Sequence, residues 1–358
     1  MSLGGAEVLL FKHYDSIIDK DLSCEILTYS NEIEDYGNRN IIEVKNFLGL
    51  LFYLILNTKR IKIIGSSGHI QLFLASFFSF NTFNYLLHQP STMSYNEFDK
   101  YAFKNLERLD YLLSKFNKKK FRRLKKKISP IKIFLLNIRF ILSKLSLKNA
   151  KKVFVLSNYA KEEKKILYNI DTIVASGAID KLIPFKKKHI GKSIKLISLS
   201  RLDKNKRIKL IINALKKINN KNIYLDIYGK GPEKQRLQRQ IESLLLTDNI
   251  KLRGFIDEKD KKQIYSKYDF SICIDFADFR ITSIESVNAS CPVILSNETS
   301  LNFIKKYDFL YFCEPNLNSL TKAILNMLDK KTNWSNREMF LNNYLWKNYF
   351  NKINDICL

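Results

Sequence analysis

The constraint that most limits how this 358-residue chain can fold is a strict alternation of short apolar segments with amphipathic segments in its second half. Strands are expected at 195–199, 223–228, 250–253, 270–274 and 293–295, and helices at 209–218, 233–246, 259–268 and from Glu285 onward. Alternation at this spacing is typical of an α/β fold with a doubly wound parallel sheet. Ligands of such sheets bind at the carboxyl ends of the strands.

The first half shows a second, less regular set of the same elements. Apolar strand patterns occur at 24–28, 61–64, 84–87 and 153–156, with helical patterns between them. The length of the chain suits two domains of ordinary size. We therefore expect an N-terminal domain at 1–175 and a C-terminal domain at 176–330, followed by a helical segment at 331–358. Ser157 or Asn158 is expected to cap the helix after the strand at 153–156.

Charge is the most unusual property of the composition. The net charge of +26 implies an anionic partner, which is a phospholipid surface, a nucleic acid or a polyanionic substrate. Nine of the thirteen residues from Lys115 to Lys127 are Lys or Arg, and the following segment to Lys148 interleaves cations with apolar residues. We expect residues 113–148 to dock on an anionic membrane. The alternative is a solvated helix that packs its apolar side within its own domain.

Several other classes of protein are disfavoured. The longest apolar run, Phe47 to Leu56, is shorter than the roughly 20 residues that span a bilayer. The five cysteines form no CxxC pair, so neither a zinc site nor a disulfide framework is indicated, and a cytoplasmic location is expected. Nucleic acid is not expected as a partner, because the aromatic residues lack the spacing of a stacking platform.

Three turns after expected strands carry residues suited to a diphosphate ester. Arg201 and Lys206 lie on a strand-to-helix turn, which offers cations together with backbone amides. Two further turns contain the glycines of Gly229-Lys230-Gly231-Pro232 and of Arg253-Gly254-Phe255. The stretch from Asp269 to Ile294 has a loop with Asp275, Asp278 and Arg280, and then Glu285 in a helix that Pro292 should end.

These residues resemble the motif of the GT-B glycosyltransferases of family 4, of the bacterial surface-polysaccharide type. That motif has two glutamates eight positions apart followed by G-x-P-V, and Glu285 with Pro292-Val293 matches its second part. Ala277 stands where the first glutamate is usual, and Ser290 where the glycine is usual. The resemblance implies two Rossmann-like domains facing a cleft. It also implies that the terminal helix crosses back to an N-terminal domain whose first strand is missing here.

The resemblance also implies roles for individual residues. His88 faces the donor sugar, Arg201 and Lys206 act on the diphosphate, and Glu285 binds the ribose hydroxyls. Asp278 is placed to substitute partly for the carboxylate that Ala277 removes. The full set of expected donor-binding positions is Gly4, Gly5, Gly229, Gly231, Gly254, Phe255, Asp278, Ile281, Thr282 and Glu285.

The function implied is a retaining, metal-independent hexosyltransferase with a UDP- or GDP-sugar as donor substrate and no other cofactor. Its acceptor is a lipid-linked glycan of capsule, lipopolysaccharide or a related polymer, at the inner face of the plasma membrane. The alternative is a non-catalytic GT-B subunit that serves as scaffold or acceptor-binding partner of an active transferase. A third hypothesis, nucleic-acid binding, predicts steeply salt-dependent binding to duplexes.

Overall fold

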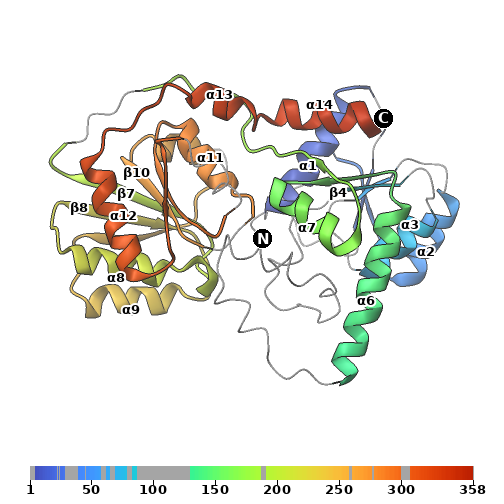
Figure 1. Ribbon diagram of the computed structural model, residues 1–358, viewed down its shortest axis with the longest axis horizontal. Coiled ribbons are helices and arrows are strands. Elements are labelled where there is room, and N and C mark those ends of the chain that lie inside the picture. The colour runs from blue at the N-terminus through green and yellow to red at the C-terminus, as the bar shows by residue number, and fades with distance from the viewer. Residues whose placement is uncertain are drawn as a thin grey trace. The chain divides into compact units, whose positions relative to one another are not determined.

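The computed structural model describes two compact units of the chain. The residues described are 5–21, 23, 25–28, 39–44, 46–57, 62–64, 69–78, 83–86, 130–186, 191–257, 260–275, 278–299 and 307–357. One unit comprises 1–112, 119–175 and 349–358, and the other comprises 113–118 and 176–348. Apart from 113–118, the chain therefore leaves the first unit after Ala175 and rejoins it at Tyr349. Figure 1 shows the helices and strands of both units.

The second unit contains a six-stranded parallel sheet of order β12-β11-β10-β7-β8-β9. Its strands are β7 (Ile194–Leu199), β8 (Ile223–Tyr228), β9 (Ile250–Gly254), β10 (Phe270–Cys273), β11 (Val293–Ser296) and β12 (Leu310–Cys313). The sequence runs outward from β7 on one side and from β10 on the other. This order confirms the doubly wound parallel sheet. It also places the topological switch point between β7 and β10.

Helices cover both faces of this sheet. They are α8 (Ile208–Ile218), α9 (Lys234–Ser243), α10 (Lys261–Tyr265), α11 (Ile281–Asn288), α12 (Leu317–Asp329) and α13 (Arg337–Asn342). On one face α8 packs against α9 and α12, and on the other α11 packs against α10 and α13. Neighbouring strand residues alternate between the two cores, since Ile294 packs with the α8 layer and Val293 and Leu295 pack with the α11 layer.

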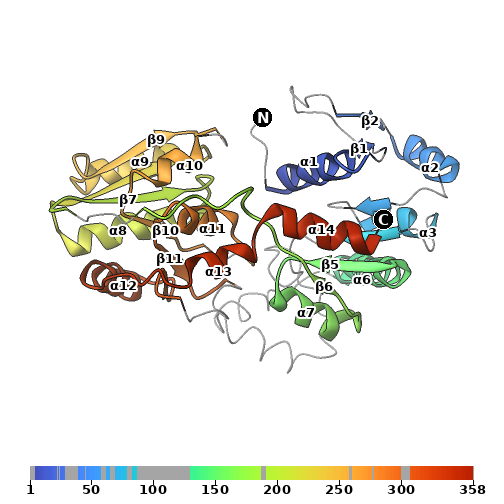
Figure 2. The same ribbon diagram turned by 90° about the horizontal axis from the view of Figure 1, so that it is seen from above.

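The first unit is built on a four-stranded parallel sheet of order β3-β4-β5-β6 and a two-stranded parallel pair. The four strands are β3 (Lys62–Ile64), β4 (Phe83–Leu86), β5 (Lys152–Val155) and β6 (Ile173–Val174), and the pair is β1 (Ile26–Thr28) and β2 (Ile41–Glu43). Its helices are α1 (Gly5–Ile18), α2 (Phe47–Leu56), α3 (His69–Phe77), α6 (Pro130–Asn149), α7 (Asn158–Tyr168) and α14 (Trp346–Cys357). Figure 2 shows these elements from above.

Local signals explain where several elements begin. The Ser157 hydroxyl accepts a hydrogen bond from the amide of Ala160 at 3.0 Å, so Ser157 is the N-cap of α7 as predicted. Pro292 follows the end of α11 and precedes β11, also as predicted. Of the segment 113–148, residues 113–129 lie outside the described part of the chain, and residues from 130 onward form α6. Among the described helices, none combines the length and apolar character that crossing a membrane requires.

Two expectations about secondary structure are wrong, and some elements were not expected. The helix that was expected to start at Glu285 begins at Ile281, because Arg280 is the extended N-cap residue (φ −126°). The helical segment expected at 331–358 is two helices, since residues 343–345 leave helical geometry where the Tyr344 carbonyl accepts from the amides of Ala178 and Ile179. The strands β2, β6 and β12 and the helix α12 were not anticipated.

A buried arginine joins three parts of the second unit. Arg337 in α13 is 2% exposed, and its guanidinium donates to the carbonyls of Val287 (3.1 Å) and Asn288 (2.6 Å) at the end of α11. It also donates to the carbonyl of Ile183 (2.8 Å), in the segment that enters the unit. Burial lowers the pKa of Arg337. The cost of burying this charge is offset by the carbonyls that it satisfies.

Replacing this arginine should destabilise the second unit strongly. Arg337→Leu leaves three carbonyls without their donor, and we expect it to lower the free energy of unfolding by about 3–5 kcal/mol. Urea denaturation followed by circular dichroism measures the loss. Arg239→Leu, on the exposed side of α9, is the matched control and should change stability by less than about 0.5 kcal/mol. Equal stability of the two variants would contradict the role assigned to Arg337.

Candidate functional site

The loops that follow β7 and β10 meet at the switch point of the sheet. The first carries Arg201 and Lys206 into the short 3-10 helix Lys204–Lys206, and the second carries Asp275 and Arg280 to the start of α11. Strands in a parallel sheet present their carboxyl ends on one edge, so the two loops emerge side by side. The candidate site is therefore positioned by the order of the strands.

Glycines hold the loop after β7 against the loop after β8. A Cβ on Gly229 would lie 1.9 Å from the carbonyl oxygen of Ser200, and one on Gly231 would lie 2.6 Å from that of Leu202. The Leu202 amide donates to the Lys230 carbonyl at 2.9 Å, and the Glu233 amide donates to the Leu202 carbonyl at 2.9 Å. The close approach of the two backbones requires glycine at both positions.

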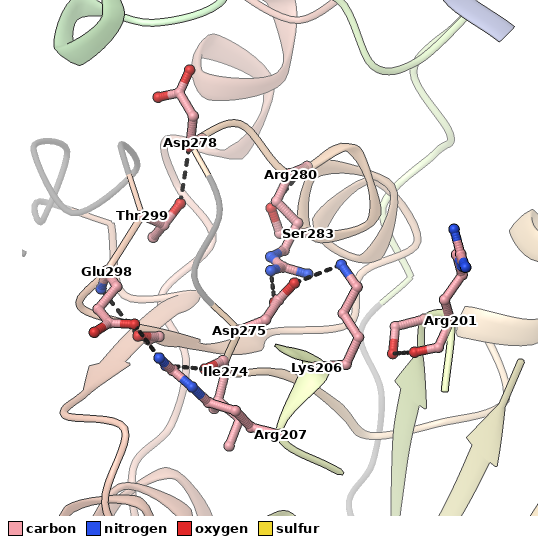
Figure 3. A network of polar contacts seen from close by, with 12 residues as sticks. Arg201, Lys206, Arg207, Ile274, Asp275, Asp278, Arg280, Ser283, Glu298 and Thr299 are labelled. Atoms are coloured by element: carbon pink, nitrogen blue, oxygen red, sulfur yellow. Dashed lines mark hydrogen bonds and ion pairs between the residues drawn. The ribbon is translucent and has the colours of Figure 1, made fainter. Parts of the chain in front are cut away.

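A carboxylate lies between two cations at the switch point (Figure 3). Asp275 is 3% exposed, and its Oδ2 lies 2.7 Å from Lys206 Nζ, while Arg280 forms an ion pair with its Oδ1. Lys206 and Arg280 come from different loops, so Asp275 joins the loop after β7 to the start of α11. Asp275 therefore fixes a cation from each of the two loops at this point.

The electrostatics of Lys206 reflect this crowding. Burial, followed by the positive charge of Arg280, lowers the pKa of Lys206 to about 8. The proton of this ammonium is consequently held less firmly than that of an exposed lysine. An anion that enters the site would favour the charged form and raise the pKa again.

A second ion pair lies beside the first. Arg207 has a left-handed backbone (φ 55°) at the N-terminus of α8, and its guanidinium donates to the carbonyl of Ile274 at 3.0 Å. Its Nη2 lies 2.5 Å from Glu298 Oε2, and the Glu298 side chain is fully buried. The residue therefore ties the start of α8 to the ends of β10 and β11.

Arg201 and Glu285 differ in how they relate to this cluster. The Arg201 side chain is 77% exposed and lies 3.3 Å from Asp203, and it extends away from Asp275 in Figure 3. Glu285, in the second turn of α11, is half-buried. Burial raises the pKa of Tyr265, and the negative charge of Glu285 raises it further. The positive charge of Arg280 acts on the same pKa in the opposite direction. Since Arg280 acts on both Lys206 and Tyr265, Glu285 belongs to the same electrostatic neighbourhood.

The residue after β9, Phe255, has an exposed aromatic ring. Gly254 has a positive φ of 84°, and no atom lies within 4 Å of the position of a Cβ. Phe255 is 45% exposed, and the Lys230 ammonium lies 5.0 Å from the centre of its ring. The glycine conformation directs the chain away from the sheet, and the adjacent ring is accessible for stacking.

The remaining predicted residues are distributed as follows. His88 and Gly4, and also Ala277, lie outside the described residues. Gly5 begins α1 in the first unit. Asp278 is buried, its carbonyl accepts from Thr299 Oγ1 at 3.2 Å, and its carboxylate points away from Asp275 in Figure 3. Ile281 and Thr282 form the first turn of α11 and are half-buried.

The sequence placed Asp275 and Arg280 on the loop after an expected strand but assigned neither a role, and it did not indicate Arg207 or Glu298. The sequence pattern that could have indicated this site is a loop with acidic and basic residues directly after an apolar strand. The sequence could not identify the partners in these ion pairs. Lys206 lies 69 residues from Asp275, and Glu298, the partner of Arg207, lies beyond the next strand. Among the described residues, no group of three or more His, Cys, Asp or Glu side chains could hold a metal ion.

Comparisons with known proteins agree with this architecture. Residues 179–343 match the family model of glycosyl transferases group 1, and this match falls within the second unit. The structure of HepE from Anabaena in complex with UDP has a TM-score of 0.73 at 13% identity, with 98% of this chain and 95% of that chain covered. Sucrose-phosphate synthase from Thermosynechococcus elongatus has a TM-score of 0.70 at 15% identity, with 99% and 92% covered. The fold is GT-B.

Similarity in sequence is confined to part of the chain. The GtfA subunit of a UDP-N-acetylglucosamine–peptide N-acetylglucosaminyltransferase from Streptococcus gordonii is 32% identical over 121 residues. The match covers 33% of this chain and 23% of that relative, so this GT-B chain corresponds to about a quarter of the relative's length. The family match contains all of the residues of the ion-pair cluster.

The turn formed by Gly229 gives a first test of the site. Gly229→Ala forces a side chain onto the Ser200 carbonyl at a positive φ of 143°, so we expect a loss of stability of about 1–3 kcal/mol and displacement of the Arg201 turn. Urea denaturation measures the first effect, and nucleotide binding measures the second. Gly191→Ala is the control, because nothing lies within 4 Å of its Cβ position. If Gly229→Ala is as stable as Gly191→Ala, the turn is not held as described.

Proposed function

We propose that this chain is a retaining glycosyltransferase of hexosyl type that moves a sugar from a nucleotide-sugar donor to a membrane-associated glycan, without a metal ion. One observation carries the proposal: Lys206 and Arg280 converge on Asp275 at the switch point of the unit that matches glycosyl transferases group 1. Cations fixed at the carboxyl edge of a parallel sheet suit the diphosphate of such a donor.

The diphosphate would bind beside the two cations, with Asp275 keeping them in place. In transfer, the bond between the sugar's anomeric carbon and the diphosphate breaks, and negative charge develops on the departing oxygen. Lys206 and Arg280 stabilise that charge, and the exposed Arg201 can turn inward to join them. Three cations of this kind supply the neutralisation that a metal ion supplies in other transferases.

The nucleoside end of the donor would lie toward Glu285 and Phe255. A carboxylate accepts two hydrogen bonds from a vicinal diol, which suits Glu285 to the ribose. The exposed Phe255 ring beside Lys230 suits the base. We propose a UDP-sugar, because UDP is the nucleotide in the HepE structure and the GtfA relative is named for UDP-N-acetylglucosamine.

The acceptor is proposed from charge. A chain with a net charge of +26 attracts polyanions, and a glycan of capsule, lipopolysaccharide or a related polymer that is linked to a membrane lipid has this character. His88 remains a proposed contact of the donor sugar from the N-terminal unit.

A second candidate function is a non-catalytic subunit that supports an active transferase. Ala277 removes the carboxylate that the family uses for the donor sugar, and the GtfA relative is itself named as a subunit. This hypothesis predicts folding without donor turnover. The two functions are therefore separated by measuring donor binding and nucleotide release on the same sample.

Isothermal titration calorimetry with UDP-sugars tests the donor site. We expect Lys206→Ala and Arg280→Ala each to weaken binding about tenfold to a hundredfold, because each removes a charge-assisted hydrogen bond of about 1.5–3 kcal/mol. Lys204→Ala is the matched control, since Lys204 lies in the same turn and is exposed. Binding that is unchanged in all three variants would refute the site, and binding without nucleotide release in the presence of acceptor would favour the subunit.

The pKa of Lys206 generates a pH prediction. With a value near 8, Lys206 is charged at pH 7 and neutral at pH 9.5, so the affinity for a UDP-sugar should be constant below pH 7.5 and fall by up to about tenfold per unit above pH 8. Lys206→Arg keeps the charge, because a guanidinium does not titrate in this range. That variant should bind with the same affinity from pH 7 to 10. A flat profile for the wild-type protein would contradict the prediction.

A further inference from the structure

Exposed apolar side chains are concentrated on three helices of the first unit. Among the described residues, nineteen large hydrophobic side chains are exposed, and twelve of them belong to α2, α3 and α6. Those twelve are Phe47, Leu48, Phe52, Ile55, Leu56, Phe77, Ile131, Phe134, Leu135, Ile138, Ile141 and Leu145. Single exposed hydrophobic residues are ordinary on a protein surface, whereas a concentration of this size marks an interaction site.

The exposed residues of α6 form one continuous stripe. They recur at intervals of three, four and seven residues from Ile131 to Leu145, which places them on one side of an α-helix. Phe134 is 63% exposed and Leu135 is 58% exposed, while Ser146 and Leu147 on another side are buried. A helix of 20 residues is about 30 Å long, so the stripe runs along most of that length.

The α2 helix has the same construction. Leu50 and Leu54 are buried, whereas Leu48, Phe52 and Leu56 are exposed at successive intervals of four residues. The helix contains no charged residue. Its one side chain with a hydroxyl, Tyr53, is already engaged, because it donates to Glu25 Oε2 at 2.5 Å. The exposed side of α2 therefore has no polar side chain to offer to a partner.

The three helices are neighbours. The α3 helix packs against both α2 and α6, and the views in Figures 1 and 2 both place α3 between them. Phe77, at the end of α3, is 63% exposed. The exposed residues of α2 and α6 thus belong to adjacent helices of one layer. We call these twelve residues the α2–α6 face.

Charge identifies the kind of partner that this face fits. None of the chain's 35 acidic residues lies in the stretches 44–96 or 111–161, which contain all three helices. Lys144 and Lys148 belong to α6 and lie on either side of Leu145, the last residue of its apolar stripe. An apolar stripe on a helix that carries cations and lacks acidic residues is the construction that binds in the plane of an anionic bilayer.

We propose that the α2–α6 face docks on an anionic lipid bilayer, with α2 as a second insertion element beside α6. A protein partner is the competing occupant. Protein interfaces carry about one hydrogen bond per 100–200 Å², and the exposed side of α2 provides no side-chain group for one. The acyl region of a bilayer requires none. The inference does not depend on sugar transfer, since vesicle binding needs neither donor nor acceptor.

Vesicle flotation of the whole chain tests the proposal. The vesicles are phosphatidylcholine alone and phosphatidylcholine with about 30% phosphatidylglycerol. One triple variant changes α6 (Phe134→Ser, Leu135→Ser, Ile138→Ser) and another changes α2 (Leu48→Ser, Phe52→Ser, Leu56→Ser). The control variant changes three exposed apolar residues of the second unit (Leu245→Ser, Leu325→Ser, Met339→Ser). All of these side chains are exposed, so circular dichroism should confirm that each variant folds.

The expected result is binding to the anionic vesicles only, at least tenfold weaker in each face variant and unchanged in the control. Three results would overturn the proposal. The wild-type chain could fail to float with anionic vesicles, or the α2 variant could bind as the wild type does. Alternatively, light scattering could show a wild-type oligomer that both face variants convert to monomer while vesicles are not bound. In that case the face is a protein interface.

Discussion

The reversal of strand order between β7 and β10 is the constraint on which the candidate site depends. Because β8 and β9 extend one side of the sheet and β11 and β12 the other, the loops after the two central strands leave the same edge without a helix between them. The residues involved are 69 apart in sequence, yet Lys206 and Asp275 are in hydrogen-bond contact. The glycines of the neighbouring turn fix the backbone that carries Arg201.

That geometry fixes cations from two separate loops beside one buried carboxylate. Asp275 faces both Lys206 and Arg280. Burial, followed by the positive charge of Arg280, lowers the pKa of Lys206 to about 8. Burying a cation is costly unless an anion lies close to it, and Asp275 supplies that anion to both. The arrangement is stable with Asp275 between the cations, and it is suited to accept a diphosphate in addition. The ion pair of Arg207 with Glu298 holds the surrounding strand ends and is not available for that purpose.

The sequence predicted five of the six strands of the second sheet, because each of those five is a short, mostly apolar segment between turn residues or amphipathic helices, whereas β12 was missed. The bounds of β8 were predicted at 223–228 and found there, and β7 differs by one residue. The start of α11 was missed by four residues, since Arg280 carries no capping side chain. The α12 helix has a readable cap, in which the Asn316 side chain accepts from the amide of Ser319, but it was overlooked. Arg201 and Lys206 were predicted from their place in the turn, and of the two Lys206 contacts Asp275. The partners of Arg337 and Arg280 depend on tertiary contacts that no local pattern encodes.

The account is tested most directly by a crystal structure of the chain with a bound UDP-sugar. It predicts that oxygens of the diphosphate lie within hydrogen-bond distance of Lys206 Nζ and the Arg280 guanidinium, with the ribose hydroxyls on Glu285. A donor bound elsewhere in the second unit, with Asp275 still holding both cations and no phosphate near them, would contradict it.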